Sequence, residues 1–76
     1  MTKLPLVSGE QVIKALCEDG FIVIRQKGSH VRMKKTTFGG WAINVTVPLH
    51  DVLDRGTLKS IIKTVGLSVD EFIELL

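Results

Sequence analysis

The stretch RQKGSHVRMKK, residues 25–35, predicts a β-hairpin with a basic surface. Gly28-Ser29 is a two-residue turn signal, and glycine in such a turn is typical of tight hairpin connections. Beyond the turn, polar and apolar residues alternate: the polar set is His30, Arg32 and Lys34, and the apolar set is Val31 and Met33. Alternation with a period of two places the two sets on opposite faces of a strand. If the apolar set packs on the core, His30 and two cations share the exposed face.

Charge is concentrated around this hairpin. Five cations lie within these eleven residues, and no Asp or Glu occurs between Asp19 and Asp51. The rest of the chain holds five cations and all eight acidic residues, so the net charge of +2 conceals a basic middle between mildly acidic flanks. A localised basic patch is the usual footprint of a polyanionic partner, most often nucleic acid. The alternative is a solvated sheet face that Lys and Arg keep soluble.

A helix is predicted before the hairpin. Ser8 is a typical N-cap, and Gln11 three residues later completes a capping box. An apolar stripe follows at helical spacing and consists of Val12, Ile13, Leu16 and Cys17. Gly20 is suited to end the helix just beyond its last turn. On this pattern Cys17 is a buried packing residue rather than a reactive thiol.

Two further strands are predicted, one before the Gly28-Ser29 turn and one after the turn at residues 36–40. Residues 21–26 are rich in β-branched and aromatic side chains and predict a strand, although the apolar run is too continuous to indicate which face is buried. Residues 36–40 form a turn that contains Gly39-Gly40. Residues 41–47 alternate again and predict a third strand, which Pro48 ends.

Helical patterns return in the last third of the chain. Thr57 is a plausible N-cap for a helix whose apolar stripe is Leu58, Ile61, Ile62 and Val65, with Gly66 at its end. Ser68 and Glu71 form a second capping box at the start of a last short helix. A helix of this length is unstable alone and must dock on the rest of the domain.

These elements predict an α+β fold in which helices cover one face of a three-stranded antiparallel sheet. Residues 1–76 are expected to form a single domain, because the length leaves no room for a second. The one cysteine excludes an internal disulfide. Neither a signal peptide nor a membrane span is evident, so we expect a cytoplasmic protein.

The order α-β-β-β-α is also that of the double-stranded RNA-binding fold. Five local strings occur in register with one another: Gly20-Phe21; residues 25–30; residues 46–50 (TVPLH); residues 55–61 (RGTLKSI); and Gly66-Leu67-Ser68 with Glu-Phe following. Together these strings resemble the HicA toxin family, small mRNA interferases of bacterial toxin–antitoxin pairs, and the resemblance covers nearly the whole chain, from Ser8 to Leu76. Each string is common alone, whereas the five in order are specific.

The resemblance implies an RNA-cleaving activity that is independent of translation, and a partner antitoxin of the HicB type that blocks it. It also implies that the histidine of the Gly-Ser-His string is catalytic, which places that role on His30. Many members of the family carry a second histidine directly after it, where this chain has Val31. The connection after His50 begins with Asp51-Val52, where a glycine is common.

The residue types also suit this chemistry by themselves. RNA is cleaved without a metal when a base removes a proton from a 2′-OH, an acid protonates the leaving oxygen and cations stabilise the charged phosphate. Histidine suits proton transfer at neutral pH, and Lys and Arg supply fixed positive charge. We expect no metal or cofactor, with His30 catalytic and the RNA bound by Arg25, Lys27, Gly28, Ser29, Arg32 and Lys34.

Several alternatives remain open from the sequence. His50, beside Asp51, is a second candidate for proton transfer, although a loop histidine bonded to backbone is the better interpretation. Phe38 and Trp41 could stack on unpaired bases, but core packing or a protein contact is favoured for them. The rival function is a non-catalytic double-stranded-RNA-binding module, which needs no histidine. A plain protein-interaction domain that docks an acidic partner is the third possibility.

Overall fold

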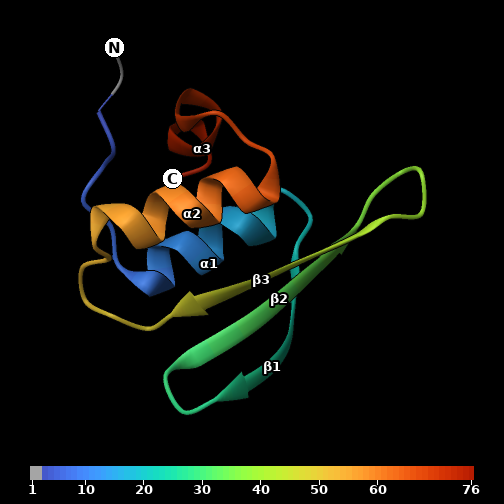
Figure 1. Ribbon diagram of the computed structural model, residues 1–76, viewed down its shortest axis with the longest axis horizontal. Helices are drawn as coiled ribbons and strands as arrows, with labels where there is room; N and C mark the ends of the chain where they lie inside the picture. Colours follow the sequence, from blue (N-terminus) through green and yellow to red (C-terminus); the bar gives the residue numbers. More distant parts are fainter. Residues whose placement is uncertain (1–2) are drawn as a thin grey trace.

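The computed structural model describes residues 3–76, so the first two residues of the expected domain lie outside the described part of the chain. The elements follow in the order α1 (Gly9–Glu18), β1 (Ile22–Lys27), β2 (His30–Thr36), β3 (Ala42–Pro48), α2 (Arg55–Val65) and α3 (Val69–Glu74). The strands form an antiparallel sheet in chain order. The helices gather on one side of it (Figure 1). The predicted α+β class and the α-β-β-β-α order are therefore confirmed.

Helix α1 begins as the capping box predicts. The backbone N–H of Gln11 donates to Ser8 Oγ over 3.1 Å, and the backbone N–H of Ser8 donates to Gln11 Oε1 over 2.9 Å. The helix ends before Gly20, whose φ of 103° is accessible to glycine at little cost. The chain changes direction directly after the helix, where the Phe21 N–H donates to the Leu16 carbonyl over 2.9 Å.

The buried stripe of α1 runs through Val12, Ala15 and Leu16. Cys17, which the pattern placed on this stripe, is exposed. Each helical residue turns the side chain by about 100°, so the residue after Leu16 already points away from the core. The buried face is turned toward Ala15 and away from Cys17, so the prediction of a buried cysteine was wrong.

One continuous core joins the helices to the sheet. Its largest fully buried side chains are Phe21, Phe72, Leu16, Met33, Leu58, Val12 and Val47. The set draws on α1, β2, β3, α2 and α3, so every layer of the fold contributes. The alternation of β2 is confirmed, because Val31 and Met33 are buried while His30 and Arg32 are exposed.

Helix α2 starts three residues earlier than predicted. Its N-cap is Asp54, whose side chain accepts hydrogen bonds from the backbone N–H and the hydroxyl of Thr57, over 3.0 and 2.6 Å. Thr57, predicted as the cap, is therefore the third residue of the helix. Both residue types cap helices well, but the two carboxylate oxygens of Asp54 accept both donors of Thr57. The helix ends at Gly66 with φ of 77°, as predicted.

Helix α3 docks through one aromatic side chain. Its Ser68–Glu71 capping box is present, with hydrogen bonds of 2.8 and 3.1 Å. The helix has six residues, too few to hold alone. Phe72 is completely buried, and burial of such a side chain contributes roughly 1.5–3 kcal/mol. No helix in residues 3–76 combines the length and apolar character that crossing a bilayer requires.

The connection from β3 to α2 is held against the start of α1. The Gly9 N–H donates to the His50 carbonyl over 2.9 Å, and the Leu53 N–H donates to the Val7 carbonyl over 2.8 Å. A Cβ built on Gly9 would overlap with the carbonyl oxygen of Pro48. This close approach fixes the end of β3, which lies beside the hairpin turn of β1 and β2.

Candidate functional site

The outer face of the sheet, opposite the helices, collects the predicted site residues. Lys27 lies opposite His30 and Arg25 opposite Arg32, and residues directly opposite each other in antiparallel strands point to the same face. His30 and Arg32 are exposed while their neighbours in β2 are buried, so this shared face is the outer one. Two cations from β1 thus join His30 and Arg32 of β2.

A β-bulge makes this arrangement possible. Ile22 is paired with Lys34 and Val23 with Met33, but the next pair is Arg25 with Arg32, so β1 has one extra residue at Ile24. If β1 had no bulge, strict alternation from Ile22 would send Arg25 and Lys27 to the inner face. The bulge shifts the alternation by one residue and turns both cations outward.

The third strand contributes a hydroxyl. Thr46 of β3 lies opposite Arg32, and Pro48 lies opposite His30. A depression of about 180 Å³ on the surface is lined by Arg25, Lys27, His30, Arg32 and Thr46. Thr46 was not among the site residues that the sequence predicts. The alternation of residues 41–47, which buries Val45 and Val47, is the signal that would have placed Thr46 on the outer face.

The turn that precedes His30 is tied to the end of β3. Gly28 has φ of 59°, and the side-chain amide of Gln26 donates to the Gly28 carbonyl over 3.1 Å. The Leu49 N–H donates to the Ser29 carbonyl over 2.7 Å. A Cβ built on Gly28 would meet no atom within 4 Å, so the backbone here is open to a ligand.

The structure therefore brings together only part of the predicted set. Arg25, Lys27, His30 and Arg32 share the depression. The turn residues Gly28 and Ser29 precede His30 but do not line the depression. Lys34 is also on the outer face, farther along β2 and half-buried opposite Asn44.

The other histidine has a different environment. His50 is exposed and follows the end of β3, and its backbone carbonyl accepts the hydrogen bond from Gly9. It is not among the residues that line the depression. Asp54, four residues further on, caps α2, and its hydrogen bonds from Thr57 hold the pKa of that carboxyl below the ordinary value of 3.8.

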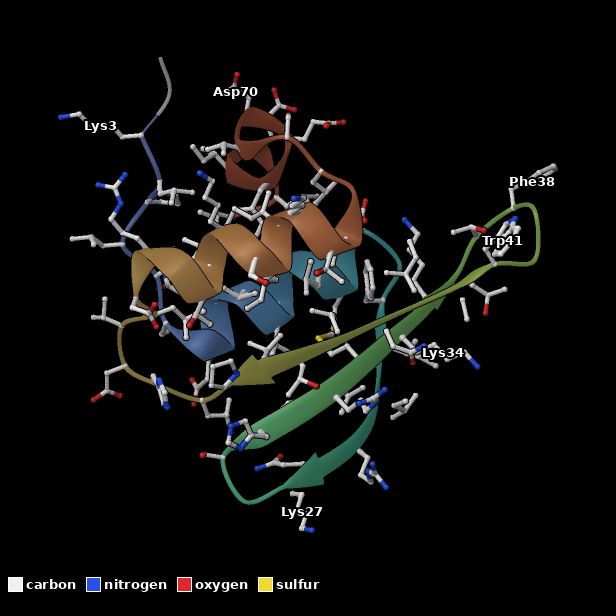
Figure 2. The ribbon with its side chains drawn as sticks, viewed as in Figure 1. Lys3, Lys27, Lys34, Phe38, Trp41 and Asp70 are labelled. Atoms are coloured by element: carbon white, nitrogen blue, oxygen red, sulfur yellow. The ribbon has the colours of Figure 1, made fainter. Side chains whose placement is uncertain are left out.

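Core packing of Phe38 and Trp41, one of the two interpretations that the sequence favoured, is wrong, whereas their contact with a partner protein stays a prediction. Both side chains are exposed at the tip of the loop between β2 and β3, which extends away from the helices (Figure 2). Hydrogen bonds order this loop: the Thr37 N–H donates to the Trp41 carbonyl over 2.7 Å, and the Trp41 N–H donates to Thr37 Oγ1 over 3.1 Å. The tip lies at the far end of β2 from His30.

The lining of the depression thus combines an imidazole, an ammonium, two guanidinium groups and a hydroxyl, with no carboxylate among them. Comparison with protein families finds a match over residues 9–67 to the family described as the HicA toxin of bacterial toxin–antitoxin. The chain belongs to the HicA toxin family. No curated protein matches the chain.

The HicA match covers both the depression and the scaffold behind it. Residues 9–67 run from the start of α1 to just beyond α2 and include all three strands. The protein is therefore the toxin of a toxin–antitoxin system, a class that functions with an antitoxin partner. Only α3, with its buried Phe72, follows the matched range.

Proposed function

We propose that this HicA toxin is a metal-independent endoribonuclease that cleaves mRNA, with His30 as general acid or base. The observation that carries the proposal is the depression in which His30 is surrounded by Arg25, Lys27 and Arg32. Imidazole exchanges protons near neutral pH, and cations favour both the approach of RNA and the extra negative charge of the reacting phosphate.

The reaction begins at a ribose 2′-OH. The imidazole of His30 removes its proton, and the oxygen attacks the adjacent phosphorus while the bond from phosphorus to the 5′ oxygen of the next nucleotide breaks. That oxygen takes up a proton, which leaves a 5′-hydroxyl and a 2′,3′-cyclic phosphate. All atoms and charges balance without a metal ion, because the proton leaves and returns through side chains or solvent.

The remaining residues bind and orient the RNA. Arg25, Lys27 and Arg32 place positive charge around the phosphate, and Thr46 can donate a hydrogen bond to a phosphate oxygen. The exposed backbone at Gly28, with Ser29 beside it, lets the phosphodiester chain approach the turn closely. Lys34 extends the positive face along β2, where it contacts RNA away from the scissile bond.

The decisive experiment is a timed cleavage assay on a long unstructured RNA in EDTA. The parent protein should cleave, and His30→Ala should be slower by about 10²–10⁴-fold, the usual contribution of general acid–base catalysis. His50→Ala is the matched control and should retain the parent rate. A parent rate in His30→Ala would overturn the mechanism. If the parent protein and His30→Ala both bind duplex RNA and neither cleaves the assay RNA, the non-catalytic double-stranded-RNA-binding module is correct instead.

The proposed partner is an antitoxin of the HicB type, encoded beside the toxin. The cationic outer face suits an acidic partner, because opposite potentials steer two proteins together. Co-purification of the toxin with an acidic product of the neighbouring gene is the expected result. A genome in which no such gene adjoins this one would contradict the partner assignment and leave the nuclease assay unaffected.

A further inference from the structure

The strand β1 has a free edge. It pairs with β2 on one side, and within residues 3–76 no strand pairs with the other side. The helices lie over β3 and leave β1 outside their cover (Figure 1). All six residues of β1 are exposed, and its apolar run of Ile22, Val23 and Ile24 is 61%, 48% and 45% exposed. Such an edge presents unpaired backbone groups that an extended segment of another chain can pair with.

The charges on β1 select the kind of segment. Arg25 and Lys27 belong to this strand, and no acidic residue occurs between Asp19 and Asp51 to balance them. A second copy of β1 would bring the same two cations to the same seam, which is destabilising. RNA would satisfy the charges, but it offers neither backbone hydrogen bonds of strand spacing nor an apolar cover for Val23.

We propose that an extended acidic segment of the antitoxin pairs with β1 as a fourth strand of the sheet. Alternation along the added strand would set its carboxylates beside Arg25 and Lys27 on the outer face and its apolar side chains beside Val23 on the inner face. Both cations also line the depression that contains His30. The added strand would therefore neutralise the residues that hold the RNA, which deepens the proposed function by naming how the partner inhibits it.

The test uses synthetic peptides and the intact toxin, without RNA. The probe is an end-blocked peptide as long as β1, six residues, in which Glu alternates with Val. One control replaces Glu with Lys, and a second replaces Val with Pro, which keeps the acidic charge but removes backbone donors. The Glu–Val peptide should bind about tenfold more tightly than either control, since the Pro control loses interchain hydrogen bonds and the Lys control meets the like charges of Arg25 and Lys27. Backbone amides of Ile22–Lys27 should show the largest NMR shifts and slowed hydrogen exchange.

Charge reversal on the toxin gives an independent arm of the same experiment. Lys27→Glu should weaken binding of the Glu–Val peptide, whereas Lys14→Glu, on the exposed side of α1, should not. Equal binding of the Glu–Val and Glu–Pro peptides would show attraction by charge alone and overturn the proposal. Concentration-dependent dimers of the toxin with protected β1 amides would show that a second copy occupies the edge, which would also overturn it. Because no RNA is present, either failure is separate from a failure of the cleavage assay.

Discussion

Lys27 lies directly opposite His30, at the last pair of positions before β1 and β2 meet in the turn. Opposite residues in antiparallel strands have Cβ atoms roughly 4.5–5.5 Å apart and share a face. Both side chains line the same depression. In the proposed reaction the imidazole moves a proton while the ammonium supplies fixed positive charge beside the phosphate.

This relationship predicts different roles for two lysines of the outer face. Lys27→Gln should slow the chemical step by about a hundredfold, a typical loss when a positioned donor at a developing charge is removed. Lys34→Gln should weaken RNA binding but leave the rate at saturating protein unchanged, because Lys34 does not line the depression. Single-turnover cleavage at increasing toxin concentration separates the two effects. Equal rate losses for the two variants at saturation would mean that the lysines of the outer face act only by attracting RNA.

The sequence predicted the fold because its local signals agree. The capping boxes at Ser8 and Ser68 form as expected, and Gly66 ends α2 in the left-handed region. The alternation of β2 correctly placed His30 and Arg32 on the exposed face. These features depend on residues within about one turn or one strand, where propensity and periodicity are strongest.

Features that depend on tertiary geometry were not predictable in this way. The bulge at Ile24 interrupts an apolar run with no glycine or other marker, yet it alone turns Arg25 and Lys27 outward. Cys17 continues the apolar spacing of α1, but the face of the helix that packs on the core runs through Ala15 and leaves Cys17 exposed. Trp41 continues the buried alternation of β3 and is nevertheless exposed, because the hairpin extends beyond the helices that would cover it.

The close approach of α1 to the end of β3 predicts a large effect at one glycine. Gly9→Ala should destabilise the protein by about 1–3 kcal/mol, as overpacking does, because its Cβ would overlap with the Pro48 carbonyl. Gly56→Ala is the matched control: it lies in the first turn of α2, where a Cβ would meet only Asp54 Oδ2 at 3.4 Å. Urea unfolding should show little loss or a small gain for the control. Equal stability of the two variants would contradict the contact.

Two capping carboxylates predict loss of stability in acid. Hydrogen bonds from Thr57 lower the pKa of Asp54 below 3.8, and hydrogen bonds from Ser68 lower the pKa of Glu71 below 4.5. A depressed pKa in the folded state means that the unfolded chain binds the proton more readily. This stability is present above the ordinary values and is lost as the pH falls through the folded-state values.

Thermal unfolding between pH 7 and pH 2 measures this effect. The parent Tm should fall as the pH drops below the ordinary carboxyl values, and Asp54→Asn and Glu71→Gln should each fall less steeply. Both variants keep a capping side chain, so they should remain folded at neutral pH. An acid slope that neither variant reduces would show that other carboxyl groups dominate.

The cations around His30 also predict the salt dependence of RNA binding. Three of them line the depression, Arg25, Lys27 and Arg32. For a single strand, the logarithm of the affinity falls with the logarithm of salt by about 0.7 per neutralised phosphate, so these three cations together with Lys34 should give a slope of about −3. RNA methylated at the 2′ oxygens cannot be cleaved by the proposed route and permits equilibrium titration.

Arg25→Gln should reduce the slope by about 0.7, since one phosphate contact is lost. Lys59→Gln, on the exposed side of α2, is the control and should leave the slope unchanged. A slope that responds equally to both substitutions would show that the RNA does not bind at the depression, and the bulge that turns Arg25 outward would then have no role in recognition.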